Sequence, residues 1–158
     1  MHVGIILAAG SGSRMGGPKA TIEIAGQRLV DRAVTVFHDG GIKDVYVVLG
    51  AWQGDVPGAQ VLINPDWQTG MGSSLRVGLD AILKNPEYSA AIISLVDLPG
   101  MTAAAIREIA DSSREIVMGS FEGKSGHPVK FARKYFPPII SLLSGCRRKD
   151  FLFLTIFA

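Results

Sequence analysis

The sequence is short of cysteine and of net charge, and both shortages exclude classes of protein. Among 158 residues only Cys146 is a cysteine, so an internal disulfide is excluded, and no Cys-x-x-Cys spacing exists for a zinc site. The formal net charge is +2 at pH 7, and the Lys and Arg residues are scattered apart from one short cluster at 147–149. We therefore expect no nucleic-acid partner.

Long apolar runs are also missing. No run of roughly 18 or more apolar residues, the length that crosses a bilayer, is present. The apolar start MHVGIILAAG is too short for a span and lacks the basic region that begins a signal peptide. We therefore expect a cytoplasmic protein without a membrane partner. With 47% hydrophobic residues, the chain is long enough to bury a core within a single domain.

Apolar runs that alternate with helical patterns predict the fold class. Uninterrupted apolar runs, typical of buried strands, occur at 3–9, 44–50 and 90–97, with shorter candidates at 60–64, 115–119 and 127–131. Apolar residues at helical spacing predict helices within 28–41, 70–84 and 102–111. Thr102 is expected to cap the third helix, and Ser73 or Ser74 the second. Strands that alternate with helices predict a three-layer α/β/α sandwich with a mostly parallel, Rossmann-like sheet.

A glycine-rich turn, LAAGSGSRMGGPK at 7–19, follows the first predicted strand. Such a turn offers unpaired backbone N–H groups, which suit anionic phosphates. Gly10 and Gly12 allow the backbone to approach a ligand closely, and Arg14 and Lys19 add two positive charges. Because ligands in open α/β sheets bind at the carboxyl ends of strands, this turn is the first candidate site. A mobile surface loop is the alternative.

Two familiar phosphate-binding motifs do not match this turn. The Walker A motif has a Gly-Lys pair followed by Ser or Thr, whereas here Pro18 precedes Lys19 and Ala20 replaces the hydroxyl. The Rossmann motif GxGxxG has a third glycine where this chain has Met15, and no acidic residue ends the second predicted strand. A nicotinamide-dependent oxidoreductase is therefore a poorly supported alternative.

Four motifs carry a resemblance to a known family. The turn at 7–19 resembles LAAGxGxRMGxPK, which is typical of nucleotidyltransferases. More narrowly, NPDWQTGMGSSLRVGL at 64–79, VDLP at 96–99 and GHPVKF at 126–131 resemble the molybdenum-cofactor nucleotidyltransferases. Among these, the enzymes that transfer cytidylate to molybdopterin are the most similar, and molybdopterin-guanine dinucleotide synthase is related. The motifs follow the family's order across 3–131.

The resemblance implies a fold and an activity. The fold is that of the nucleotide-diphospho-sugar transferases, with one NTP-transferase domain over 1–158. The activity is transfer of CMP from CTP to molybdopterin, with Mg²⁺ as cofactor and pyrophosphate as the second product. GMP transfer from GTP is one alternative, and a catalytically impaired nucleotide-binding or accessory protein of molybdoenzyme maturation, with a molybdoenzyme as partner, is another. Transfer to a sugar phosphate is a further alternative, against which the GMGSSL motif argues.

The resemblance also implies roles for individual residues. Arg14 would hold the β- and γ-phosphates, and Lys19 would neutralise charge at the α-phosphate. The residues implied in nucleotide binding are Leu7, Ala8, Ala9, Gly10, Gly12, Gly70, Met71 and Ser74. On the acceptor side, His127 is a candidate for contact with the pterin. Ser73 is a second candidate, or simply a helix cap.

Asp97 is the metal ligand that the resemblance implies. It follows a continuous apolar strand, where a carboxylate has little structural reason to be, and Mg²⁺ prefers oxygen ligands. The family more often has Asp-Gln-Pro here, so Leu98 removes any contact that the Gln side chain makes. A turn aspartate before a proline is the alternative. Trp67, in the second motif, is expected to pack against the sheet.

The end of the chain departs from the family. Relatives continue with Gly-Asp-x-Gly-Ala-Arg and a further helix, whereas 144–158 read SGCRRKDFLFLTIFA, with Cys146 at the expected Asp position. A frameshift would account for this, because codons for 146–149 read one base later can encode Ala-Gly-Ala-Arg. We therefore expect an atypical, truncated or frameshifted tail at 145–158, and the DNA sequence tests this. A genuine FLFLTIF strand packed on the sheet is the alternative.

Overall fold

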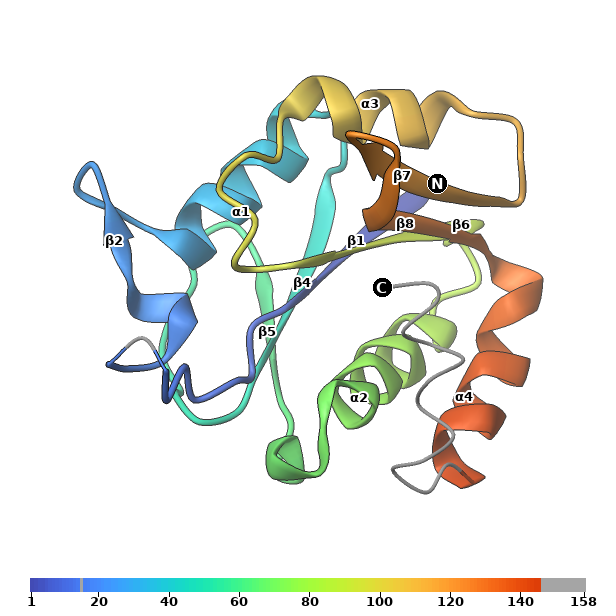
Figure 1. The fold of residues 1–158 in the computed structure, drawn as a ribbon. Helices are drawn as coiled ribbons and strands as arrows, with labels where there is room; N and C mark the ends of the chain where they lie inside the picture. The colour runs from blue at the N-terminus through green and yellow to red at the C-terminus, as the bar shows by residue number, and fades with distance from the viewer. Residues whose placement is uncertain (15, 146–158) are drawn as a thin grey trace.

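A six-stranded sheet with helices on both faces organises the chain in a computed structural model, which describes residues 1–14 and 16–145 (Figure 1). Across the sheet the strand order is β5-β4-β1-β6-β8-β7. The strands are β1 His2–Leu7, β4 Asp44–Leu49, β5 Gln60–Ile63, β6 Ala90–Leu95, β7 Ile116–Phe121 and β8 Lys124–Ala132. A separate two-stranded hairpin pairs β2 Glu23–Ile24 with β3 Gln27–Arg28.

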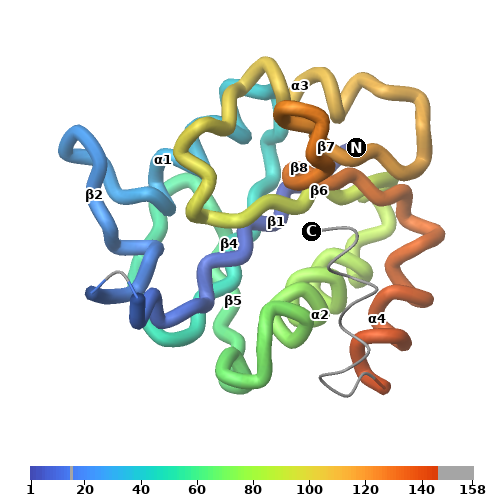
Figure 2. Tube along the Cα trace, in the orientation of Figure 1, coloured from blue at the N-terminus to red at the C-terminus, as the bar shows by residue number. Residues whose placement is uncertain are grey.

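The helices form the two outer layers. They are α1 Leu29–Asp39, α2 Met71–Leu83, α3 Ala103–Asp111 and α4 Phe136–Gly145, with short 3₁₀ turns η1 Lys19–Thr21, η2 Trp67–Thr69 and η3 Arg133–Tyr135. Helices α1 and α3 pack on one face of the sheet, and α2 and α4 lie side by side on the other (Figure 2). The predicted three-layer α/β/α sandwich is confirmed. None of the helices within the described residues is long and apolar enough to cross a membrane.

The sheet is mostly parallel, as predicted. β1 pairs in parallel with β4 on one side and β6 on the other, and β4 pairs in parallel with β5. β8 is antiparallel to both β6 and β7, so a β7–β8 hairpin completes the sheet. The register of this hairpin shifts between Met118 and Gly119, which marks a β-bulge. Two residues with positive φ, Glu122 and Gly123, form its turn.

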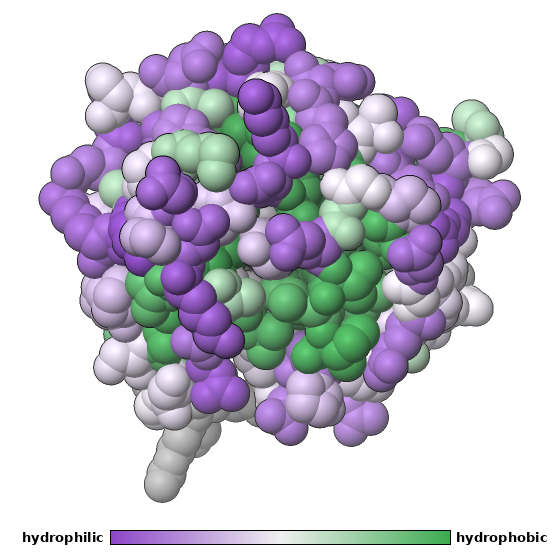
Figure 3. All heavy atoms as spheres, turned by 180° about the vertical axis from the view of Figure 1, so that it is seen from behind, coloured by the Kyte–Doolittle hydropathy of each residue, from purple (hydrophilic) through white to green (hydrophobic). Residues whose placement is uncertain are grey.

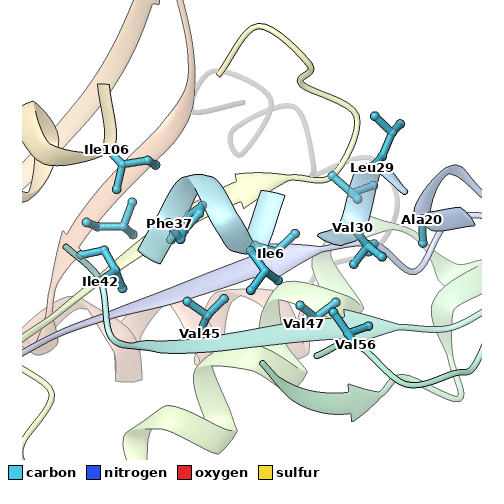
Figure 4. Packing of buried hydrophobic residues seen from close by; sticks show 14 of the residues in the cluster. Ile6, Ala20, Leu29, Val30, Phe37, Ile42, Val45, Val47, Val56 and Ile106 are labelled. Atoms are coloured by element: carbon cyan, nitrogen blue, oxygen red, sulfur yellow. The ribbon is translucent and has the colours of Figure 1, made fainter. Parts of the chain in front are cut away.

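Two apolar clusters fill the space between the layers. On the α1 and α3 side, Phe37, Ile6 and Ile106 point toward one another from α1, β1 and α3 (Figure 4). Only glycine fits at position 4, because a Cβ there would lie 2.5 Å from a carbon of the Phe37 ring. On the α2 and α4 side, the fully buried members include Val3, Ile5, Val48, Leu79, Ile82, Ala91 and Phe136. Both faces of β1 are therefore covered, which explains its uninterrupted apolar sequence.

Cations close the carboxyl ends of two helices. Lys130, only 5% exposed, donates hydrogen bonds from Nζ to Ala110 O at 3.0 Å and Ser112 O at 2.7 Å, where α3 ends. Burial lowers the pKa of Lys130. Arg133 donates to Leu83 O at 2.7 Å, at the end of α2. Positive charge at this end stabilises a helix because its last carbonyls have no partner within the helix. At the other end of α3, the Thr102 cap is confirmed, because its Oγ1 accepts from Ala105 N at 3.2 Å.

Part of the apolar surface stays uncovered. Seen from behind, hydrophobic side chains gather near the middle of the face, bordered by hydrophilic ones (Figure 3). The large hydrophobic residues that are more than one-third exposed are Met1, Ile24, Ile63, Met71, Ile116, Phe121 and Leu142. The tail after Gly145, including Cys146 and the FLFLTIF segment, lies outside the described residues.

Candidate active site

The glycine-rich turn begins as a fixed extension of β1. Ala8 N donates to Val48 O at 2.9 Å, and Ala51 N donates to Ala9 O at 3.0 Å, so the backbone at 8–9 still follows the neighbouring strand β4. Leu7, Ala8 and Ala9 are all less than 10% exposed. Gly10 is exposed, and a Cβ added there would meet nothing within 4 Å. Open space therefore lies beside the backbone just where the fixed part of the turn ends.

Gly12 is required by the turn itself. Its φ is 58°, and a Cβ added there would lie 1.9 Å from Gly17 O. Gly17 N donates to Gly12 O at 3.4 Å, so the turn closes on itself between these glycines. Beyond Gly12, the exposed Arg14 has no hydrogen-bond or ion-pair partner among residues 1–14 and 16–145. Its guanidinium is thus free to bind an anionic ligand.

Lys19 and Asp97 come together although they belong to different motifs. Lys19 Nζ donates to Asp97 Oδ2 at 2.5 Å, and about a third of each side chain is exposed. Lys19 lies in η1 after the glycine-rich turn, and Asp97 follows β6. Because β1 and β6 are parallel neighbours, both residues lie at the carboxyl edge of the sheet. The predicted catalytic cation and the predicted metal ligand therefore share one site.

Helix α2 begins next to an unusual backbone conformation. Gly70, its N-cap residue, has φ 126° and ψ 173°, a conformation open essentially only to glycine. No side chain caps the helix, so the expectation that Ser73 or Ser74 caps α2 is wrong. The helix starts earlier, at Met71, and both serines lie inside its first turns. Its N-terminal end therefore keeps unpaired N–H groups.

Asn64 explains what the two serines do. It is 1% exposed, and its Nδ2 donates to Ser73 Oγ at 2.8 Å and to Ser74 Oγ at 2.9 Å. Its Oδ1 accepts from Asp66 N at 3.0 Å, and Ser73 Oγ donates to Gly70 O at 2.8 Å. This network connects the end of β5 to the start of α2. No role was predicted for Asn64, although an amide directly after an apolar strand marks the carboxyl edge of a sheet.

Trp67 packs beside Gly50, next to the start of the glycine-rich turn. A Cβ added at Gly50 would lie 2.5 Å from Trp67 Cβ and 2.9 Å from Ala9 Cβ. The indole therefore packs across Gly50, at the end of β4, toward the fixed part of the turn. The expected packing of Trp67 against the sheet is confirmed, and it leaves this residue a structural role.

His127 lies on β8, close enough to Asp97 to be affected by its charge. Its Nδ1 is 3.2 Å from Ile93 O, so Nδ1 carries the hydrogen and Nε2 is an acceptor. That Nε2 is buried and has no hydrogen-bond partner in the described part of the chain. Burial lowers the pKa of His127, opposed by the hydrogen bond to Ile93 and by the Asp97 charge. Burial therefore disfavours the charged form of the imidazole.

The donor set at this edge fits a metal shared with phosphates. Within residues 1–14 and 16–145, no three His, Cys, Asp or Glu side chains gather around one point. Asp97 is thus a single carboxylate with one-third of its side chain exposed. Mg²⁺ is commonly held by one or two carboxylates together with substrate phosphates and water. Asp97 fits that arrangement, with the remaining ligands supplied by a bound nucleotide.

Comparison with known proteins identifies the family. Residues 4–153 match the sequence profile of the MobA-like NTP transferase domain. The chain belongs to this family. The family predicted from the four motifs is therefore confirmed, and the paired Lys19 and Asp97 lie within the matched region. The match runs past the described residues, into the segment whose sequence departs from the expected pattern.

Individual relatives extend this result. The chain is 32% identical over 158 residues to nicotine blue oxidoreductase of Paenarthrobacter nicotinovorans, which covers 90% of this chain and 76% of that protein. Rv0371c of Mycobacterium tuberculosis H37Rv has a similar fold, with a TM-score of 0.80 and 24% identity over 97% of this chain and 80% of that one. A manganese complex of Rv0371c aligns with a TM-score of 0.77 and 22% identity, covering 99% and 82%.

A nucleotidyl transferase from Methanothermobacter shares the fold as well. It aligns with a TM-score of 0.74 and 20% identity, and it covers 99% of this chain and 82% of that one. Structural similarity at 20–24% identity establishes the fold and does not establish a shared substrate. The Paenarthrobacter relative is named as an oxidoreductase.

Proposed function

We propose that this protein is a cytoplasmic nucleotidyltransferase that moves CMP from CTP to molybdopterin and releases pyrophosphate. The observation that supports this most is the direct contact of Lys19 with Asp97 beside the open backbone at Gly10. A cation, a carboxylate and exposed backbone N–H groups at one edge of a sheet form a site for a polyphosphate. CTP is preferred to GTP because of the resemblance of the motifs, and GMP transfer is the alternative.

Phosphate binding starts from Arg14, whose side chain has no partner within residues 1–14 and 16–145. Arg14 holds the β- and γ-phosphates, which leave together as pyrophosphate. The backbone of Ala8, Ala9, Gly10 and Gly12 lines the nucleotide, because the turn is fixed at its start and open beyond Gly10. Leu7, less exposed than these glycines, forms the floor.

The chemical step is an in-line displacement at the α-phosphorus. An oxygen of the acceptor's phosphate forms the new P–O bond, and the bond from the α-phosphorus to the oxygen bridging to the β-phosphate breaks. Lys19 leaves Asp97 to neutralise the charge that develops on the α-phosphate oxygens. A divalent metal, which we propose to be Mg²⁺ held by Asp97, supplies further neutralisation of phosphate charge when bound. The protein otherwise contributes positioning, which accounts for much of such catalysis.

The base lies at the start of α2. Its N–H groups have no side-chain cap, and Met71 is 40% exposed beside Gly70. Ser74 is 3% exposed and hydrogen-bonded to Asn64, so it acts by fixing the first turn that faces the base. Ser73 has the same partner and the same role. His127, whose charged form is disfavoured by burial, belongs to the acceptor side.

Pyrophosphate release tests the proposed function. The protein is incubated with molybdopterin and Mg²⁺, with CTP or GTP in parallel reactions, and with a chelator in a third. We expect release with CTP, none without metal, and loss of release in Lys19→Ala. Release with GTP alone would assign the alternative base. Nucleotide binding without release under any condition would instead favour the impaired nucleotide-binding protein, acting beside a molybdoenzyme.

An oxidoreductase is the second candidate, because the Paenarthrobacter relative carries that name. The glycine-rich turn argues against a nicotinamide cofactor in this chain, since it lacks the third glycine of the Rossmann motif. Titration with NADH decides between the two: binding in the micromolar range, without pyrophosphate release from CTP or GTP, would replace the transferase proposal.

A further inference from the structure

Helix α1 contacts both of the segments that carry the Lys19–Asp97 pair. On the Lys19 side, Ala20 is fully buried in the same apolar cluster as Leu29 of α1 (Figure 4). The backbone N–H of Leu29 also donates to Ile22 O at 2.8 Å, just after η1. The helix therefore fixes the segment that carries Lys19 through packing and through a backbone hydrogen bond.

The segment that carries Asp97 is a loop tied to the sheet near its two ends. Val96 N donates to the end of β1 at 3.1 Å, and residues 97–101 then belong to no strand or helix. At the far end of the loop, Ser94 donates from Oγ to Met101 Sδ at 3.4 Å. Ser94 is 1% exposed and lies on β6, so this contact ties the loop back to the strand that precedes it.

Arg32 of α1 holds the middle of this loop. Its Nη2 donates to Pro99 O at 3.0 Å, two residues after Asp97. Leu98 and Pro99 line, together with side chains of α1, a cavity of only about 10 Å³, so the loop lies closely against the helix. Proline fixes its own φ and restricts the residue before it. Few freely rotating backbone bonds therefore separate the held carbonyl of Pro99 from Asp97.

This link matters most when Lys19 and Asp97 separate. In the proposed function, Lys19 moves to the α-phosphate and Asp97 holds the metal. The hydrogen bond from Arg32 then keeps the Asp97 loop in place on α1, the helix that also fixes the Lys19 segment. Mg²⁺ demands near-ideal octahedral geometry with oxygen ligands at about 2.0–2.1 Å, so a carboxylate on a loosely held loop binds it poorly.

We propose that Arg32 is a positioning residue for the metal ligand. Through Pro99 O it fixes the carboxylate of Asp97 relative to the segment that carries Lys19. Arg32 itself contacts neither the nucleotide nor the metal. This role rests on the proposed function, because it takes Asp97 to be the metal ligand. It implies that metal-assisted nucleotide binding depends on Arg32, whereas metal-free nucleotide binding does not.

The gain in nucleotide affinity that a metal brings measures this role. The probes are the α,β-methylene analogues of CTP and GTP, which cannot release pyrophosphate. Calorimetry on the whole protein gives their dissociation constants with Mn²⁺, which takes the same oxygen ligands as Mg²⁺, and with EDTA. The ratio of the two constants is the gain. Arg32→Met keeps the apolar stem beside the loop and removes the donor.

In Arg32→Met we expect the gain to fall by about three- to tenfold. The fall should be smaller than the roughly 10–100-fold typical of a group bonded directly to a metal ligand, because Arg32 acts through the backbone. The dissociation constant in EDTA should not change. Both hydrogen-bonding partners stay in the fold, and the contact is exposed, so the variant should melt near the parent temperature.

Arg107→Met is the matched control. Like Arg32, Arg107 is exposed and donates from Nη2 to a backbone oxygen of another element, Asp39 O at 2.8 Å. Asp39 is the last residue of α1, at the end of the helix away from Arg32 and from the candidate active site. We expect the gain and the dissociation constant in EDTA to stay at the parent values in this variant.

The outcomes separate the role of Arg32 from the proposed function. A smaller gain in Arg32→Met alone supports the role. An unchanged gain, an equal fall in Arg107→Met, or no gain in the unaltered protein would overturn it. Weaker binding of Arg32→Met in EDTA would also overturn it, because Arg32 would then contact the nucleotide directly.

Pyrophosphate release from CTP or GTP is measured separately on the unaltered protein. A gain that falls in Arg32→Met, without any release by the unaltered protein, would support the positioning role and reject only the transfer reaction. Release by the unaltered protein, together with an unchanged gain in Arg32→Met, would reject only the role of Arg32.

Discussion

The ammonium of Lys19 and the carboxylate of Asp97 neutralise each other across 78 residues of sequence, at 2.5 Å. In the proposed function, Lys19 binds the α-phosphate and Asp97 holds the metal. When a metal–nucleotide complex binds, the Lys19–Asp97 ion pair would be replaced by two others, Lys19 with phosphate and Asp97 with the metal. Neither charge would be left unpaired. Without a ligand, the ion pair between Lys19 and Asp97 holds both side chains at the site.

Loss of either partner should abolish most of the turnover. We expect Lys19→Ala and Asp97→Ala each to lower kcat/KM for pyrophosphate release by about 100- to 1,000-fold, the effect of losing one preorganised charge. Both residues are about one-third exposed, so the folded state should persist in circular dichroism spectra. Lys43→Ala, an exposed cation just before β4 at the opposite edge of the sheet, should be neutral. A near-normal rate in either variant would reject the role given to that residue.

Gly10 and Gly12 should respond differently to alanine. Gly12→Ala places a Cβ against Gly17 O and forces a left-handed residue, so stability should fall by at least about 1–2 kcal/mol. Gly10→Ala meets no protein atom within 4 Å, so the melting temperature should not change. Its CTP affinity should fall because the methyl group enters the space for the nucleotide. Unchanged CTP affinity in a stable Gly10→Ala would place the nucleotide elsewhere.

Asn64 should matter for both stability and nucleotide binding. Asn64→Ala leaves the buried Ser74 hydroxyl and the half-buried Ser73 hydroxyl without their donor and should cost about 1–3 kcal/mol in urea unfolding. CTP affinity should fall as well, since the first turn of α2 loses its fixed position. Asn85→Ala is the control, because the hydrogen bond that Asn85 Oδ1 accepts from Glu87 N is exposed. Equal losses of stability and CTP affinity in the two variants would contradict a specific role of the Asn64 hydrogen bonds.

Lys130→Met separates charge from packing. The methionine fills similar space but leaves Ala110 O and Ser112 O unpaired, so the free energy of unfolding should fall by about 1.5–3 kcal/mol. Burial and, after it, the charge of Lys130 lower the pKa of His2. Removing that charge should therefore raise the pKa of His2 toward its ordinary value. The ring proton shifts of His2, followed against pH, measure this; an unchanged or lower pKa would contradict it.

Local patterns predicted most of the elements, because burial and helix periodicity act over a few residues. The strand before the glycine-rich turn, the three helices and the Thr102 cap follow from such patterns. The sequence predicted only that Lys19 and Asp97 lie at the same edge of the sheet. Their direct contact depends on β1 and β6 being neighbouring strands. The motifs predicted roles for Lys19 and Asp97, and the structure shows the distance between them.

The misses have separate physical causes. Helix α4, Phe136–Gly145, has two prolines in its first turn and no polar face that marks its period, so the sequence showed no helix there. The first half of β8 is polar and is held by pairing with β7 rather than by burial. Ser73 and Ser74 were expected to be caps, because their hydrogen-bond partner Asn64 follows β5 and cannot be seen from the pattern of α2.

The bulge between Met118 and Gly119 affects how copies of the protein meet one another in concentrated solution. β7 is one outer strand of the sheet, and the extra residues of the bulge, 127–128, lie on its partner β8, so the local twist of the β7–β8 pair increases. β5, the other outer strand, is only 4 residues long. Neither margin presents a long flat template, so the sheet resists addition of strands from a second chain and with it fibril growth.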